Sequence, residues 1–193
     1  CLIAGIDEAG RGPWAGPVVA GAVILDQATM PQELLLGLDD SKKLKPAKRE
    51  ALFQLLKHHA DIGIGISEVD EIDEINILQA TLRAMSRALD ALTGKPDIAL
   101  VDGNRPPKLS CSVQCIVKGD ELSSSIAAAS IVAKVTRDKI METLADSFPG
   151  YGWEKNSGYG TKAHQDGLKQ LGVTPHHRKS FKPIIKILGQ ESR

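Results

Sequence analysis

The sequence predicts an α/β fold built on a mixed β-sheet, and three observations carry this prediction. Short apolar runs typical of strands alternate with longer segments that repeat apolar residues at helical spacing. Their order is strand, strand, helix, strand, helix, strand, strand, helix and a helical tail. Some links between strands are too short for parallel crossovers, so some neighbouring strands must be antiparallel.

The strands are expected where short apolar runs end at glycine, proline or aspartate. The segment 60–67 instead alternates isoleucine with glycine at the period of a strand. A turn over residues 10–17, rich in glycine and proline, joins the first two strands. The expected strands are 2–7, 18–25, 60–67, 98–101 and 113–117.

The helices are expected where apolar residues recur three or four positions apart. Pro46 suits the first position of one helix, and we expect Gly94 to cap another. The small side chains at the start of segment 123–148 allow tight packing against a sheet. The expected helices are 47–59, 76–92, 123–148, 161–171 with Thr161 as its cap, and 181–188, and the segment 149–161 is expected to be a long loop.

Length and composition are those of a globular protein with a full core. The 193 residues are 42% apolar and 25% charged, and their net charge is zero. No apolar run reaches the roughly 18 residues of a membrane span, and no leader precedes the first strand, so we expect a cytoplasmic protein. Cys111 and Cys115 lack the second pair of a zinc site, so reduced thiols are expected. Residues 151–193 are predominantly basic and can face a polyanion.

Three aspartates each stand at the C-terminal end of an expected strand: Asp7, Asp102 and Asp120. Ligands of open α/β sheets gather beyond the carboxyl ends of strands. Carboxylates that meet there raise one another's pKa, and a divalent cation relieves the repulsion. A single aspartate here is more often only a turn residue. Three strand ends together with Glu8 favour a site for Mg²⁺ or Mn²⁺.

Glu8 poses a geometric difficulty for this site. Successive residues of a strand point to opposite faces of the sheet, so Asp7 and Glu8 cannot both face one site from a regular strand. Either the strand breaks after Asp7, or Glu8 reaches the site from beyond the edge of the sheet.

The turn after Glu8 has the spacing of a dinucleotide-binding loop. Residues 10–15 match the pattern G-x-G-x-x-A, which holds a pyrophosphate only when a helix follows at once. Here Pro13 and Pro17 lead into a strand, and two acids precede the turn. A nucleotide-dependent oxidoreductase is therefore disfavoured. The glycines still allow close approach of a substrate to the backbone, which fits a metal-assisted reaction of a phosphate-bearing substrate.

Taken in order, the motifs of the chain resemble those of bacterial ribonuclease HII. The matching segments are Asp7–Gly12, Asp40–Leu44, Glu74–Asn76, Val101–Asn104, Lys118–Asp120, Ser125–Asp138, Gly158–Tyr159 and His177–Phe181. The resemblance implies a ribonuclease H-like fold, with a mixed five-stranded sheet flanked by helices and a C-terminal helical extension. It implies a catalytic core over residues 1–150. Residues 151–193 would form a substrate-sensing loop and a helical segment packed on that core as a single structural unit.

The resemblance also implies an activity. The chain would be an endonuclease that cuts the RNA strand of RNA–DNA hybrids and nicks duplex DNA on the 5′ side of an embedded ribonucleotide. Two Mg²⁺ or Mn²⁺ ions would assist the hydrolysis, which leaves a 3′-hydroxyl and a 5′-phosphate. We expect a monomer with no membrane contact and no obligate protein partner. A module that binds hybrids without turnover is the alternative if the carboxylates are only turn residues.

Motif matching assigns expected roles to individual residues. The catalytic carboxylates and metal ligands would be Asp7, Glu8, Asp102 and Asp120. The substrate would be bound by Gly10, Arg11 and Gly12 through backbone contacts to a 2′-hydroxyl, by Tyr159 on the sugar at the RNA–DNA junction, and by Lys43, Asn76 and Lys134 at phosphates. Asp138 would support the site, or would be a surface partner of Arg137 or Lys139. No role is assigned to Trp14.

Overall fold

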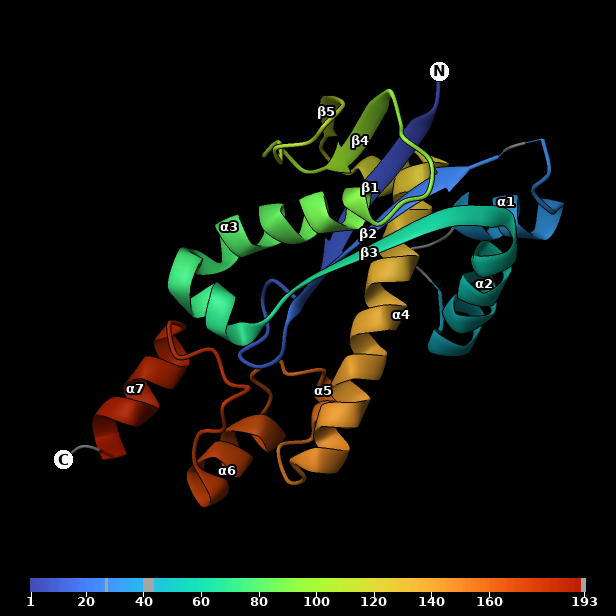
Figure 1. The fold of residues 1–193 in the computed structure, drawn as a ribbon. Coiled ribbons are helices and arrows are strands. Elements are labelled where there is room, and N and C mark those ends of the chain that lie inside the picture. Colours follow the sequence, from blue (N-terminus) through green and yellow to red (C-terminus); the bar gives the residue numbers. More distant parts are fainter. Residues whose placement is uncertain (27, 40–43, 192–193) are drawn as a thin grey trace.

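A mixed five-stranded sheet forms the centre of the computed structural model, which describes residues 1–26, 28–39 and 44–191 (Figure 1). The strand order is β3-β2-β1-β4-β5. β1 pairs antiparallel with β2 and parallel with β4, β2 pairs antiparallel with β3, and β4 pairs parallel with β5. The expected mixed sheet is therefore confirmed. The strands are β1 (Ile3–Ala9), β2 (Val18–Leu25), β3 (Ala60–Ser67), β4 (Ile98–Asp102) and β5 (Ser112–Ile116).

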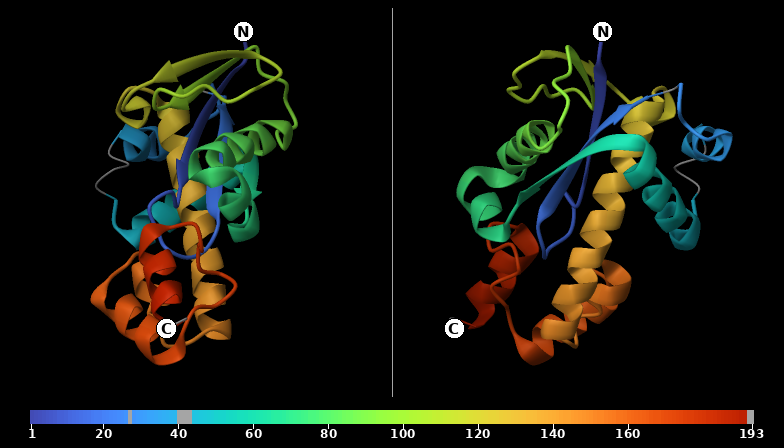
Figure 2. Two further views of the ribbon diagram at one scale, coloured as in Figure 1. Left: turned by 90° about the vertical axis from the view of Figure 1, so that its left-hand side faces the viewer. Right: turned by 45° about the vertical axis from the view of Figure 1, so that its right-hand side comes forward.

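Helices cover both faces of this sheet. The long helices α3 and α4 lie on opposite faces (Figures 1 and 2), and α1 and α2 pack beside α4. Three further helices follow α4 beyond one end of the sheet (Figure 2). The helices are α1 (Gln32–Asp39), α2 (Pro46–His59), α3 (Val69–Asp90), the 3₁₀ turn η2 (Gly119–Glu121), α4 (Ser124–Ser147), α5 (Trp153–Asn156), α6 (Lys162–Leu171) and α7 (Lys182–Glu191).

Glycines in the strands let the two long helices lie against the backbone of the sheet. A Cβ at Gly5 would overlap the backbone of Ser125 in α4, and a Cβ at Gly21 would overlap the carbonyl oxygen of Ala129. On the other face, a Cβ at Gly63 would overlap the carbonyl oxygen of Ala88 in α3. The tight packing expected from the small side chains of α4 is thus present.

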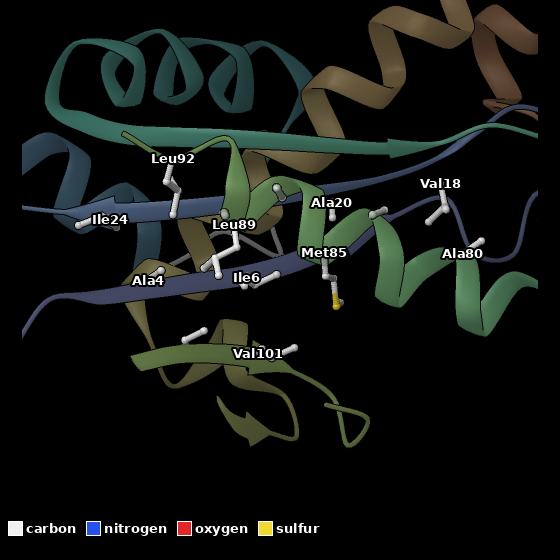
Figure 3. Packing of buried hydrophobic residues seen from close by; sticks show 14 of the residues in the cluster. Ala4, Ile6, Val18, Ala20, Ile24, Ala80, Met85, Leu89, Leu92 and Val101 are labelled. Atoms are coloured by element: carbon white, nitrogen blue, oxygen red, sulfur yellow. The ribbon is translucent and has the colours of Figure 1, made fainter. Parts of the chain in front are cut away.

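The apolar core between α3 and the sheet fixes the relative position of the ends of β1 and β4. Ile6 of β1 and Val101 of β4 are fully buried and pair in register, and they lie beneath Met85 and Leu89 of α3 (Figure 3). Burying side chains of this size stabilises a fold by about 1.5–3 kcal/mol each. The residues that follow this pair, one on each strand, are therefore held side by side.

The C-terminal segment docks on the loop between β1 and β2. Its backbone exchanges hydrogen bonds with that loop: Trp14 N donates to the Gly158 carbonyl oxygen at 2.8 Å, and Arg178 N donates to the Trp14 carbonyl oxygen at 2.8 Å. Trp153 and Ile184 are buried together with Met141, near the end of α4. No helix in the described part of the chain is long and apolar enough to span a membrane.

The element boundaries differ from the expected ones at particular places. β1 extends two residues past Asp7. α3 begins at Val69 rather than at residue 76, and it bends at Asn76, whose φ of 69° is non-helical and whose side-chain oxygen accepts a hydrogen bond from Gln79 N at 3.1 Å. The expectation of a cap at Gly94 is wrong, because Ala91 ends this helix. α1 was not expected, and α5 lies inside the expected loop.

A buried pair of neutral histidines ties α6 to the segment before α7. Thr174 N donates to His177 Nδ1 at 2.9 Å, so the ring proton of His177 is on Nε2, which faces His164 Nε2 at 3.0 Å. His164 Nε2 also accepts from Trp153 Nε1 at 3.2 Å, so its proton is on Nδ1 and is donated to the Tyr159 carbonyl oxygen at 3.0 Å. Neither ring can gain a proton without breaking this chain of hydrogen bonds. Burial and the neighbouring His164 lower the pKa of His177 to about 3.

This pair predicts a loss of stability in mild acid. Because the unfolded chain takes up a proton near pH 6.5 and folded His177 does not until about pH 3, the free energy of unfolding falls as the pH drops below 6.5. The expected contribution between pH 7.5 and pH 5 is about 2 kcal/mol, measured by denaturant unfolding. His177→Gln should flatten this pH dependence, and His58→Gln, at the exposed end of α2, should leave it unchanged. Equal pH dependence in the wild type and His177→Gln contradicts the assignment.

Candidate active site

The end of the central strand pair brings two aspartates together. β1 and β4 are parallel and pair up to Ile6 and Val101, so Asp7 and Asp102 are the next residues on adjacent strands. Asp102 Oδ1 accepts a hydrogen bond from Gly119 N at 2.7 Å, which draws the 3₁₀ turn η2 to the same end of the sheet. Asp120, the next residue, lies in that turn rather than directly at the end of β5.

The charges of this cluster act most strongly on Asp7. Its side chain is buried, with 7% of the residue exposed. Burial raises the pKa of Asp7 well above its ordinary value, and the charges of Glu8, Asp102 and Asp120 raise it further. The structure therefore brings Asp7 and Asp102 together at adjacent strand ends, as the strand-end argument predicted, whereas Asp120 acts on Asp7 from the turn η2 and not from a strand end.

Glu8 reaches this cluster without a break in the strand. β1 stays paired with β2 as far as Ala9, so a strand that breaks after Asp7 is the wrong alternative. Glu8 instead lies at the end of the sheet, where it lines two cavities and its side chain is 15% exposed. Burial raises the pKa of Glu8, the charge of Arg11 opposes that shift, and the charge of Asp102 adds to it. Asp7 and Glu8 therefore face a common region at the strand end.

The donor set suits a hard divalent cation. Carboxylates gathered in this way repel one another, and Mg²⁺ and Mn²⁺ prefer oxygen ligands of this kind. No three acidic, histidine or cysteine side chains among the described residues surround a single point closely enough to hold an ion by themselves. Mg²⁺ is commonly held by one or two carboxylates together with waters and substrate phosphates. The residues fit a metal site that a phosphate-bearing substrate completes.

A cavity of about 390 Å³ opens beside Glu8. It brings together residues from four distant parts of the chain, most of them expected at the site. Its lining includes Gly10, Arg11 and Gly12 of the β1–β2 loop, Lys134 of α4 and Tyr159. Arg49 of α2 also lines it and was not singled out in the sequence. The cationic lining suits an anion, and Glu8 is the one member of the acidic cluster among its lining residues.

Two buried arginines shape the turn that borders this cavity. Arg178 donates to the carbonyl oxygens of Gly10 at 2.6 Å, Arg11 at 2.9 Å, Gly16 at 2.9 Å and Pro17 at 3.2 Å. Arg137 donates to the carbonyl oxygens of Pro17 at 2.9 Å, Ala15 at 3.0 Å and Ser157 at 2.8 Å. Neither guanidinium forms an ion pair with a described residue, so carbonyl dipoles offset the cost of burying the charges. Burial lowers the pKa of Arg178 to about 9 and that of Arg137 to about 10, so both stay protonated at neutral pH.

Residue type and periodicity did not mark these two arginines as functional. An arginine in a helix or in a basic tail is usually an exposed residue, and only the fold shows that both side chains are 2% exposed or less. Both lie within motifs that resemble ribonuclease HII, Ser125–Asp138 and His177–Phe181.

Tyr159 is held next to residues 10–12, which we call the glycine turn. A Cβ at Gly12 would stand 3.3 Å from Cε1 of the Tyr159 ring, and the tyrosine is 49% exposed. Its neighbour Gly160 lies flat against the indole of Trp14, where a Cβ would overlap the ring. Trp14 therefore packs under the loop that carries Tyr159.

The remaining expected residues lie in different positions. Lys134 lines the cavity and forms an ion pair with Asp138 at 2.6 Å, and Asp138 also accepts from Ser157 Oγ at 3.2 Å. The alternative partners considered for Asp138 are wrong, because Lys139 pairs with Glu50 and Arg137 donates to carbonyl oxygens. Asn76 is exposed at the bend of α3 and lines neither cavity that contains Glu8. Lys43 lies outside the described residues.

The packing of Gly10 against Arg137 predicts a difference between two glycines. Gly10 and Gly103 have nearly the same φ, 96° and 97°, but a Cβ at Gly10 would overlap the Arg137 side chain whereas Gly103 has open space around it. Alanine costs about 1 kcal/mol at either position because of the backbone conformation. Gly10→Ala should cost a further 1–3 kcal/mol, roughly, from the displaced guanidinium. Chemical denaturation measures both, and equal losses contradict the packing described.

Comparison with known proteins agrees with the motifs. Residues 4–184 match the family model for ribonuclease HII. A ribonuclease HII from Paramagnetospirillum magneticum is 59% identical over 187 residues, which cover 97% of this chain and 93% of that protein. The crystal structure of the ribonuclease H2 from Pyrococcus horikoshii OT3 has a TM-score of 0.84 and 31% identity and covers 100% of both chains. Bst-RNase HIII in complex with Mn²⁺ has a TM-score of 0.78 at 18% identity, covers 100% of this chain and 71% of that one, and shares the fold.

The five-stranded mixed sheet with flanking helices is the ribonuclease H-like fold of these proteins. The match to the family model extends from the first strand into the last helix, so it includes every described residue of the acidic cluster and of the cavity. The chain therefore belongs to the ribonuclease HII family, metal-dependent endoribonucleases that cleave the RNA of RNA–DNA hybrids.

Proposed function

We propose that this chain also nicks duplex DNA on the 5′ side of an embedded ribonucleotide, and that Asp7, Glu8, Asp102 and Asp120 are its catalytic carboxylates. The observation that carries the proposal is the junction of the acidic cluster with the 390 Å³ cavity, because Glu8 belongs to both. A phosphate bound in the cavity next to the glycine turn lies beside the acids that would hold a metal.

The carboxylates hold negative charge where the scissile phosphate arrives. Asp7 and Asp102 are fixed by adjacent strands, and Gly119 N fixes the orientation of Asp102. Two divalent ions, when bound, supply a nucleophilic water and stabilise the leaving 3′-oxygen of an in-line displacement, which leaves a 3′-hydroxyl and a 5′-phosphate. The physiological ion is Mg²⁺ or Mn²⁺, in keeping with the oxygen donors and with the Mn²⁺ of the ribonuclease HIII structure.

The glycine turn and Tyr159 recognise the sugar. Gly10, Arg11 and Gly12 line the cavity, Arg11 and Gly12 are exposed, and backbone groups placed in this way can distinguish a 2′-hydroxyl from hydrogen. Tyr159 stands over Gly12, so that its ring can pack on the neighbouring deoxyribose at an RNA–DNA junction. Lys134 contacts a phosphate from the wall of the cavity, and Asp138 orients its ammonium group. We assign further phosphate contacts to Asn76 and Lys43 by their motifs alone.

Asp7→Asn separates catalysis from folding. The variant should lose about 10³-fold in the rate of nicking a duplex with one ribonucleotide under Mg²⁺, because a metal ligand is removed. It should unfold at the same or a higher temperature, because a buried charge that its neighbours disfavour has been removed. Single-turnover cleavage and thermal unfolding measure the two effects.

The matched control for this experiment is Asp146→Asn, on an exposed face of α4. It should leave both the rate and the stability unchanged. Wild-type nicking by Asp7→Asn contradicts the assignment. A wild-type protein that binds the duplex but never cuts it with Mg²⁺ or Mn²⁺ supports the alternative of a binding module.

Tyr159 is expected to matter more for junctions than for long hybrids. Tyr159→Ala should lower the single-turnover rate on a duplex with one ribonucleotide about tenfold more than the rate on a continuous hybrid, because ring stacking on a sugar next to the junction is lost. Tyr159→Phe keeps the ring and should retain the preference. An equal loss on both substrates contradicts a role at the junction.

A further inference from the structure

The glycine turn has carbonyl groups that point inward and amide groups with no partner. The carbonyl oxygens of Gly10 and Arg11 both accept hydrogen bonds from the fully buried guanidinium of Arg178, at 2.6 and 2.9 Å. In the described part of the chain, neither Arg11 N–H nor Gly12 N–H donates to any acceptor. Both residues are exposed and line the cavity beside Glu8.

The geometry of the peptide group connects these two facts. The peptide bonds of the turn are trans, so the C=O and N–H of one peptide unit point in opposite directions. The Gly10 carbonyl shares its unit with Arg11 N–H, and the Arg11 carbonyl shares its unit with Gly12 N–H. When Arg178 holds both carbonyls on the buried side, both N–H groups are turned to the exposed side.

We propose that Arg178 is a positioning residue for substrate, whose guanidinium fixes two successive backbone N–H groups as a paired donor site for an oxygen of the ribonucleotide. This inference rests on the proposed recognition of the sugar by the glycine turn, and it names the group that makes the turn competent. The oxygen that two such donors take is a ribose 2′-hydroxyl or a phosphate oxygen. Only the first distinguishes RNA from DNA.

This role requires a guanidinium group, because its N–H donors point in several fixed directions within one plane. One guanidinium spans the Gly10 and Arg11 carbonyls and also bonds Gly16 and Pro17, so four carbonyls of the loop are fixed relative to one another. A lysine keeps the positive charge but presents a single ammonium centre. Arg137 provides a matched comparison, because it is equally buried and bonds three carbonyls, none of which belongs to Gly10 or Arg11.

The test compares binding of two duplexes by variants that do not cut them. In an Asp7→Asn background with Mg²⁺, fluorescence anisotropy gives the Kd for a DNA duplex with one ribonucleotide and for the same duplex made only of DNA. The preference is the ratio of the two constants. Arg178→Lys should reduce this ratio about tenfold, the worth of one or two hydrogen bonds, while the Kd for the DNA duplex stays the same. Arg137→Lys leaves the hydrogen bonds to the Gly10 and Arg11 carbonyls in place, so it should lower the unfolding temperature but reduce the ratio less than Arg178→Lys does.

Each outcome bears on the proposal. A parent protein without any preference refutes recognition of the sugar and overturns this inference with it. A parent with a preference that Arg178→Lys retains overturns the role of Arg178 alone. Equal loss of the preference in both lysine variants overturns it too, because loop stability would then explain the effect. A weaker Kd for both duplexes with an unchanged ratio shows that the donors hold a phosphate oxygen and overturns the choice of the 2′-hydroxyl.

A measurement without substitution in the turn covers the case in which Arg178→Lys does not fold. In the Asp7→Asn protein, the amide protons of Arg11 and Gly12 should exchange rapidly with solvent, because neither donates to an acceptor among residues 1–26, 28–39 and 44–191. The duplex with one ribonucleotide should slow their exchange at least about tenfold, and the DNA duplex should not, as measured by NMR. Amides that are already protected in the free protein overturn the proposal.

Discussion

Two buried positive charges hold this fold together at its functional end. Arg137 comes from α4 and Arg178 from the segment before α7, and both donate to carbonyls of the loop that joins β1 to β2. Burying a guanidinium is costly unless its donors are satisfied, so the loop must keep its carbonyls turned inward. The position of the C-terminal segment, the shape of the glycine turn and the cavity beside Glu8 all depend on this constraint.

At the acidic cluster, unlike at the two arginines, hydrogen bonds do not fully offset the cost of burying charge. Asp7, Glu8 and Asp102 meet at a strand end where burial and mutual repulsion raise the pKa of the first two. Hydrogen bonds from Glu8 N and Gly119 N, at 2.7 Å each, stabilise Asp7 and Asp102. These hydrogen bonds leave negative charge that a divalent cation would neutralise. A site of this kind lowers the stability of the folded protein in return for activity. The two arginines stabilise the β1–β2 loop and the C-terminal segment. The carboxylates would instead bind a metal ion and the substrate.

Much of this architecture could be predicted from the sequence because it follows local periodicity. The alternation of isoleucine and glycine predicts the bounds of β3, and the position of Asp7 and Asp102 at strand ends predicts that they lie together. The short helix α5 could not be predicted, because it lies between Gly152 and Ser157, which both adopt left-handed backbone conformations and leave no room for a periodic pattern. Arg137 and Arg178 were missed for a different reason: burial of a charge is decided by tertiary contacts, which a single sequence does not display.

The central claim is that the acidic cluster at this strand end supports hydrolysis of the phosphodiester on the 5′ side of a ribonucleotide. Product analysis of a duplex with one ribonucleotide, incubated with Mg²⁺ and resolved to single nucleotides, tests it most directly. The proposed function predicts one nick on the 5′ side of the ribonucleotide, with a 3′-hydroxyl on one fragment and a 5′-phosphate on the other. A nick on the 3′ side, or a 2′,3′-cyclic phosphate formed by attack of the ribose hydroxyl, would contradict it.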